Sequence, residues 1–165
     1  MFVINRTADA WKQVAGVIRR ELPRLEATLV AVPAGDETMM SAFSFDDVRT
    51  AYIFDDEEQR RAYSEHYPDE ICVGKPHKTP PLAPSSPFPL ELLKMSSEML
   101  TPSLKDCLRV ARLARLNDLT QHGKSIVCAG GENGVIDTAI VVLPGLRSDH
   151  ADARIIETLC APYEN

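Results

Sequence analysis

The chain has 165 residues, a length that suits one domain with its own hydrophobic core. Hydrophobic residues make up 44% of it and charged residues 25%, proportions that exclude a wholly disordered chain. The formal net charge of -6 disfavours sequence-independent binding to the phosphates of nucleic acids. No apolar run approaches the roughly 20 residues that a helix needs to cross a bilayer, so no membrane association is expected.

The negative charge is concentrated in the N-terminal half. Residues 1–70 hold 14 Asp or Glu against 8 Lys or Arg, whereas residues 71–165 hold 10 of each. Because an acidic surface attracts basic groups, we expect this half to engage a protein partner and not nucleic acid.

The four cysteines are far apart, and no secretory segment precedes them. This spacing, in a chain large enough to build its own core, indicates reduced thiols and a cytoplasmic location. Cys72 and His77 lack the further ligands of a tetrahedral site, so we expect neither a metal nor a cofactor. The cysteines are Cys72, Cys107, Cys128 and Cys160.

The first 36 residues predict a helix between two strands. Phe2–Ile4 suits a short strand, and apolar residues at helical spacing predict a helix from about Ala8 to Leu22. Ala27–Val32 has β-type composition and is followed by turn residues. The helical apolar positions are Trp11, Val14, Ala15, Ile18 and Leu22.

An acidic hairpin is the next prediction. Met39–Phe45 and Val48–Phe54 have the composition of strands, and Asp46-Asp47 between them suits a tight turn. A helix should follow as far as about Tyr67, because the negative residues 55–58 favour the first turn of a helix.

Six prolines occur between Lys75 and Pro89, so this segment is predicted to be an extended connector within the domain. The PxxP spacing of Pro81 and Pro84 would also suit an aromatic-lined groove, although the connector is the favoured interpretation. A short helix is expected for residues 90–100.

The C-terminal third predicts helix, hairpin and helix. Thr101-Pro102 should begin a long helix that runs to about His122 and stops at Gly123. Residues 125–129 and 135–143 should be antiparallel strands joined through Asn133-Gly134. A last helix should begin at residue 148 or 149 and end near Cys160.

These elements predict a single α+β domain over residues 1–165, with a mainly antiparallel sheet of about five strands packed against helices. Residues 75–89 form its Pro-rich connector. Apart from the extra helices and the connector, the element order resembles that of small acidic secretion chaperones. The resemblance is one of topology, and it implies no activity.

The loop at residues 144–150 is the main candidate ligand site. Arg147, Ser148 and Asp149 are predicted ligand-binding residues, because helix N–H groups and a guanidinium bind phosphate or carboxylate. His150 is the candidate acid or base, with Glu132 as a second one. Capping of the predicted helix by Ser148 or Asp149 is the simpler explanation of the same residues.

Two other patterns have simpler explanations. Cys128 lies within an apolar strand and is expected to be an inert small hydrophobe, although His122 or His150 beside it would allow a reactive thiolate. Lys105, Arg109 and Arg112 form a basic stripe, expected to be solvated or paired with acidic residues of the first half of the chain.

Two functional hypotheses follow. The first is a binding or regulatory protein, chaperone-like or immunity-like, that engages a protein partner through its acidic N-terminal half and self-associates, for example as a homodimer. The second is a small enzyme or sensor acting on an anionic metabolite at residues 144–150. The sequence leaves open whether the protein is an enzyme.

Overall fold

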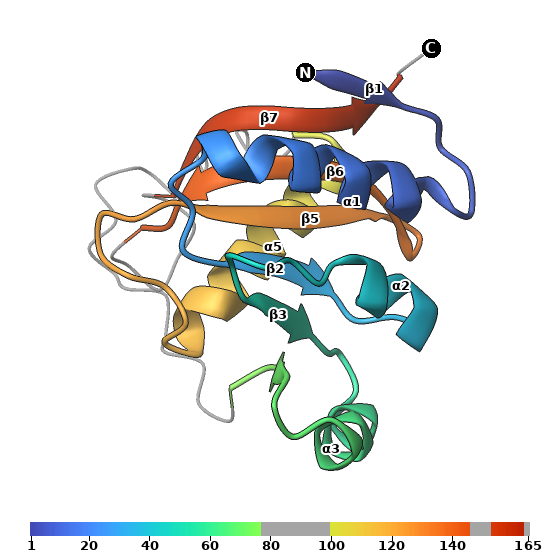
Figure 1. Cartoon of the computed structure of the whole chain (residues 1–165), viewed down its shortest axis with the longest axis vertical. Helices are drawn as coiled ribbons and strands as arrows, with labels where there is room; N and C mark the ends of the chain where they lie inside the picture. The colour runs from blue at the N-terminus through green and yellow to red at the C-terminus, as the bar shows by residue number, and fades with distance from the viewer. Residues whose placement is uncertain (77–99, 146–152, 164–165) are drawn as a thin grey trace.

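The computed structural model describes residues 1–76, 100–145 and 153–163 (Figure 1). Seven strands form one sheet in the order β1-β7-β6-β5-β2-β3-β4. The pairings show that six strands run in one direction and only β6 opposes them. The strands are β1 (Phe2–Ile4), β2 (Val30–Pro33), β3 (Thr50–Ile53), β4 (Ile71–Val73), β5 (Ile126–Glu132), β6 (Val135–Leu143) and β7 (Arg154–Pro162).

Helices cover both faces of this sheet. Figure 1 shows α1 and α2 in front of it, α5 behind it, and α3 beyond β3 near the β4 edge. The result is a three-layer α/β domain. The described helices are α1 (Ala10–Glu21), the 3-10 turn η1 (Leu22–Arg24), α2 (Glu37–Ala42), α3 (Glu57–His66) and α5 (Pro102–Leu116).

The central strands are apolar on both faces, which is typical of parallel strands buried between two helical layers. In β2, Val30 and Val32 pack toward α1, while Ala31 packs toward α5. The same alternation divides β5, where Val127 joins the α1 side and Cys128 the α5 side. The prediction of an α+β domain with a mainly antiparallel sheet is therefore wrong: this is a mixed and mostly parallel α/β sheet.

Several local predictions are confirmed. α1 buries Val14, Ala15 and Ile18 of the predicted stripe, α3 has Glu57 and Glu58 in its first turn, and Asn133-Gly134 joins the antiparallel strands β5 and β6. Thr101 caps α5 by accepting a hydrogen bond from the backbone N–H of Leu104, at 3.3 Å. The part of the Pro-rich connector beyond Pro76 and the helix expected for residues 90–99 lie outside the described residues.

The predicted hairpin around Asp46-Asp47 is wrong because residues 37–42 form α2. Asp36 caps this short helix by accepting a hydrogen bond from the backbone N–H of Met39, at 2.8 Å. The chain then crosses to β3, which pairs parallel to β2. The apolar run has a composition that also suits a strand, but the cap at Asp36 favours a helix there.

The last predicted helix is wrong as well, because Arg154–Pro162 is the strand β7. Its pairing with β6 shifts register twice, which leaves Leu159 and Ile156 as extra residues on β7. Each bulge interrupts the two-residue alternation of a strand. The apolar residues consequently fall at a spacing that imitates a helix.

The helix α5 ends at Leu116, six residues before its predicted last residue, His122. Asp118 takes a left-handed conformation, with φ 57°, and its N–H donates to the carbonyl oxygen of Arg115. The N–H of Leu119 donates to the carbonyl oxygen of Ala114, which completes a Schellman motif. Asp118 is thus the left-handed residue that ends the helix, a role that was predicted for Gly123.

The three-residue strand β4 was not predicted, and the expected resemblance to secretion chaperones does not hold. The observed order places the helix α2 where that resemblance needs a strand, and the strand β7 where it needs a helix.

Candidate functional site: a cleft at the strand ends

The parallel strands β2, β3, β4 and β5 end at the same edge of the sheet. The chain moves outward from β2 to β3 and β4, then returns to place β5 on the other side of β2. In open α/β sheets, ligands bind outside the carboxyl ends of the strands where the strand order reverses in this way. The fold therefore makes this edge of the sheet the expected place for a binding site.

A cavity of about 550 Å³ lies at this edge, and we call it the strand-end cleft. Its walls come from the segments that follow β2, β3 and β4, from the β5–β6 hairpin, and from one side of α5. The lining residues are Pro33, Asp55, Lys75, Pro76, Asp106, Arg109, Arg112, Leu113, Leu116, Gly131, Asn133 and Gly134.

Arg109 is held at this cleft by two carboxylates. Its Nε donates to Oδ1 of Asp106 at 2.7 Å, and its Nη1 donates to Oδ1 of Asp55 at 3.1 Å. Asp106 is fixed in turn, because its Oδ2 accepts a hydrogen bond from the backbone N–H of Gly131 at 3.1 Å. The pairing of Arg109 with Asp55 confirms, for this residue, the expected pairing of the basic stripe with the acidic half.

The glycines of β5 allow two close approaches, of Gly130 to α5 and of Gly131 to the partner strand β6. A Cβ on Gly130 would lie 2.7 Å from the backbone nitrogen of Cys107, and a Cβ on Gly131 would lie 1.5 Å from the carbonyl oxygen of Val135. Both contacts are too close for any other residue type. The glycine-rich segment is therefore a hairpin packed against a helix, as the sequence predicted.

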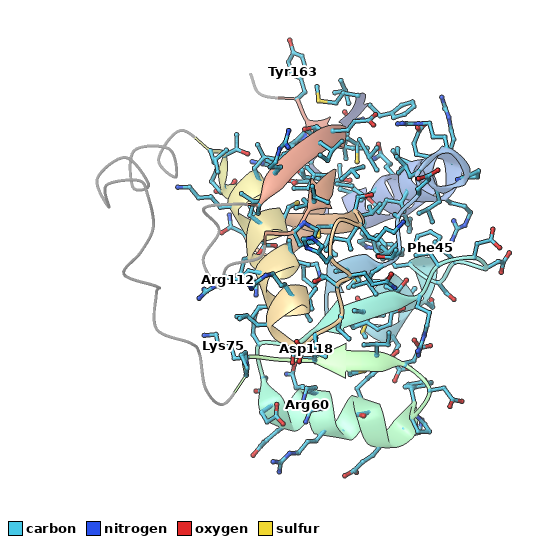
Figure 2. All side chains as sticks on the ribbon, turned by 90° about the vertical axis from the view of Figure 1, so that its left-hand side faces the viewer. Phe45, Arg60, Lys75, Arg112, Asp118 and Tyr163 are labelled. Carbon is cyan, nitrogen blue, oxygen red and sulfur yellow. The ribbon has the colours of Figure 1, made fainter. Side chains whose placement is uncertain are left out.

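Lys75 and Arg112 add positive charge to the cleft. Figure 2 shows both side chains on the side of the sheet that α5 covers, where Lys75 follows β4 and Arg112 belongs to α5. The lining residues that the structure describes include three cationic side chains and two carboxylates, and both carboxylates bind Arg109. The formal charge of these described residues sums to +1.

Glu132 does not line this cleft. Its Oε2 accepts a hydrogen bond from Nη1 of Arg6 at 3.0 Å, and the Nε of the same arginine donates to Oδ2 of the fully buried Asp137 at 2.9 Å. Arg6 thus connects the end of β1 to the β5–β6 hairpin. A catalytic role for Glu132 stays a prediction.

The other predicted site residues, Arg147, Ser148, Asp149 and His150, lie outside the described residues. The helix expected to run from there to Cys160 is contradicted, because its second half is part of β7. The ligand-binding roles of Arg147, Ser148 and Asp149 and the acid or base role of His150 stay predictions.

The cysteines are free thiols. Burial holds the pKa of the Cys128 thiol well above its usual range and raises that of Cys160 to about 12. Such thiols stay protonated at neutral pH, so Cys128 is the inert hydrophobe that the sequence predicted. Across the residues that the structure describes, no three His, Cys, Asp or Glu side chains gather where they could hold a metal ion.

Sequence reasoning missed Asp55 and Lys75 as site residues because it assigned Asp55 to the start of a helix and Lys75 to the connector, beside a mainly antiparallel sheet. Each lies two residues beyond the end of a strand, and only a parallel arrangement brings such residues to one edge. A charged residue right after an apolar β-type run was the available signal.

No protein-family model matches this sequence, and no curated protein sequence matches it. Among residues 1–76, 100–145 and 153–163, no helix combines the length and the apolarity needed to span a membrane.

Proposed function

We propose that the protein binds a small ligand bearing a phosphate or carboxylate group in the strand-end cleft. The observation that supports this most directly is the convergence of Lys75, Arg109 and Arg112 on one cavity at the carboxyl edge of parallel strands. Guanidinium groups match the geometry of phosphate and carboxylate, and an ammonium group adds a point charge.

The fixed position of Arg109 supports the same proposal. Since Asp55 and Asp106 hold its guanidinium from two sides, little side-chain entropy remains to be lost when a ligand arrives. The hairpin residues Asn133 and Gly134 and the apolar side chains of Leu113 and Leu116 complete a wall with both polar and apolar parts. This proposal replaces residues 144–150 as the anion site and concerns binding, without assigning a reaction.

Thermal stability in the presence of defined anions tests this function. We expect inorganic pyrophosphate, a nucleoside triphosphate or citrate to raise the melting temperature, because a ligand at 100 times its dissociation constant adds about 2.7 kcal/mol to stability. Calorimetric titration of the best anion should then give one site per chain.

A matched pair of charge reversals locates the site. Lys75→Glu, within the cleft, should abolish the stabilisation, whereas Lys105→Glu makes the same change at an exposed α5 position outside the lining and should leave it intact. Equal loss in both variants would mean that the anions act through overall charge. No stabilisation by any of the three anions would count against the proposal.

A further inference from the structure

We infer a second binding site at the opposite edge of the sheet, where an apolar groove with an acidic rim accepts a basic segment of a protein partner. We call it the acidic groove. It is a cavity of about 460 Å³ between the end of α1 and the loop before β3. Its lining consists of Arg19, Leu22, Pro23, Leu25, Ser44, Phe45, Asp46, Asp47 and Val48.

The groove has an apolar floor. Leu22 and Leu25 contribute from the turn after α1, and Phe45 and Val48 from the loop, with all four side chains only partly buried. An aliphatic or aromatic side chain of a partner would cover this floor. Apolar area of this kind supplies the affinity of most protein contacts.

The loop is held in place by Arg19. Its Nη2 donates to the carbonyl oxygen of Ala42 at 2.9 Å and to that of Ser44 at 3.4 Å, and its guanidinium stacks 5.2 Å from the centroid of the Phe45 ring. These contacts occupy the guanidinium that lines the groove. They also fix one wall before any partner arrives.

The rim is negative. Asp46 and Asp47 are exposed and have no ion pair within the described part of the chain. A second hollow of about 230 Å³ on the other side of the loop adds Asp69 and Glu70, with Arg49 as its only cation among the described lining residues. Arg49 donates to the carbonyl oxygen of Asp69 at 3.0 Å, which leaves four carboxylates around the loop.

Charge complementarity therefore selects the occupant. A segment that places a lysine or arginine next to an apolar side chain would satisfy both the rim and the floor. Figure 2 shows Phe45 on the α1 side of the molecule, away from Lys75 and Arg112, so the groove and the strand-end cleft are separate sites. The two can be tested independently.

The test uses the whole chain and a defined probe, the peptide Ac-Lys-Leu-Lys-Leu-Lys-Leu-NH2. In a titration followed by amide resonances, we expect the largest shifts at residues 22–25 and 44–48. The matched peptide with Glu in place of Lys should not bind. Raising the salt concentration should weaken binding, because the rim charges are exposed.

Two double variants with the same loss of charge separate the groove from overall acidity. Asp46→Asn with Asp47→Asn should weaken binding at least about fivefold, since two exposed ion pairs are lost. Glu58→Gln with Glu65→Gln, at exposed positions of α3 outside the groove, should leave it unchanged. Absence of binding, shifts confined to other surfaces, or equal weakening in both variants would overturn the inference.

Discussion

The two ends of the parallel strands use charged residues in different ways. At the carboxyl edge, Asp55 and Asp106 hold Arg109, and Asp106 also accepts a hydrogen bond from a backbone N–H. At the amino edge, Asp46 and Asp47 make no ion pair within the described residues. Side chains of one type therefore serve structure at one edge and remain accessible at the other.

This difference corrects a simple use of net charge. The acidic excess of residues 1–70 suggested one continuous interaction surface, yet Asp56 caps α3, Glu57 binds Arg60 and Asp55 binds Arg109. Only a fraction of the carboxylates is left for a partner. The predictions below test the contrast between the two edges, beginning with the largest expected effect.

Gly131→Ala should be the most damaging change at the carboxyl edge. A Cβ there would meet the carbonyl oxygen of Val135 at 1.5 Å, so the hairpin would have to move away from its observed position. We expect a loss of more than about 3 kcal/mol in the free energy of unfolding, measured by urea denaturation. Gly16→Ala, in α1 with no atom within 4 Å of the added Cβ, should instead stabilise by about 0.5–1 kcal/mol. A small loss of stability for Gly131→Ala would mean that β5 and β6 can move apart at residue 131 at little cost.

Asp106→Ala and Asp46→Ala compare the two edges directly. The first removes a partner of Arg109 and leaves the N–H of Gly131 without its acceptor, which should cost about 1–3 kcal/mol. The second removes an exposed carboxylate and should change stability by less than about 0.5 kcal/mol. Equal costs in chemical denaturation would contradict the distinction between paired and accessible carboxylates.

Asp56→Ala should have an intermediate effect. The Oδ1 of Asp56 accepts hydrogen bonds from the backbone N–H groups of Glu58 and Gln59, at 2.8 and 3.1 Å. Loss of such a cap costs about 1 kcal/mol. Asp56→Asn retains an acceptor and should restore most of the stability, whereas a loss of similar size in both variants would indicate that charge and not capping matters.

The smallest effect concerns acid stability. Hydrogen bonds from Arg60 lower the pKa of Glu57 to about 2, so its contribution is present above its ordinary pKa and is lost as the pH falls from about 5 toward 2. Glu57→Gln should therefore flatten this limb of a plot of unfolding free energy against pH. Salt at 1 M should do the same. An unchanged limb in Glu57→Gln would assign acid sensitivity to other carboxylates.

Local chemistry was predictable where one cap or turn decides the structure. Thr101-Pro102 and Asn133-Gly134 each have one favoured conformation, and both were predicted correctly. Strand direction was not predictable, because it depends on where the chain goes after each strand. The acidic pair Asp46-Asp47 suited a tight turn equally well whether a helix or a strand came before it.

The strand-end cleft could not be predicted from the sequence either, because it depends on strand direction. Lys75, Arg109 and Asp55 are far apart in the sequence, and their proximity exists only once β3 and β4 pair in parallel. The basic stripe of α5 was recognised, and pairing with the acidic half was one of two expectations for it, but Asp55 was not identified as the partner of Arg109. In β7, two bulges concealed the strand period itself.

The pairing of β1 with β7 has a consequence for synthesis. The ribosome releases β1 before the other described strands of the sheet and β7 after them, yet β7 is the strand to which β1 pairs. During translation β1 therefore has no partner strand until β7 has emerged, whereas β2, β3 and β4 can pair with one another earlier. Figure 1 shows β1 beside β7 at this edge of the sheet, so the pairing of these two strands is a late step in the folding of each newly made chain.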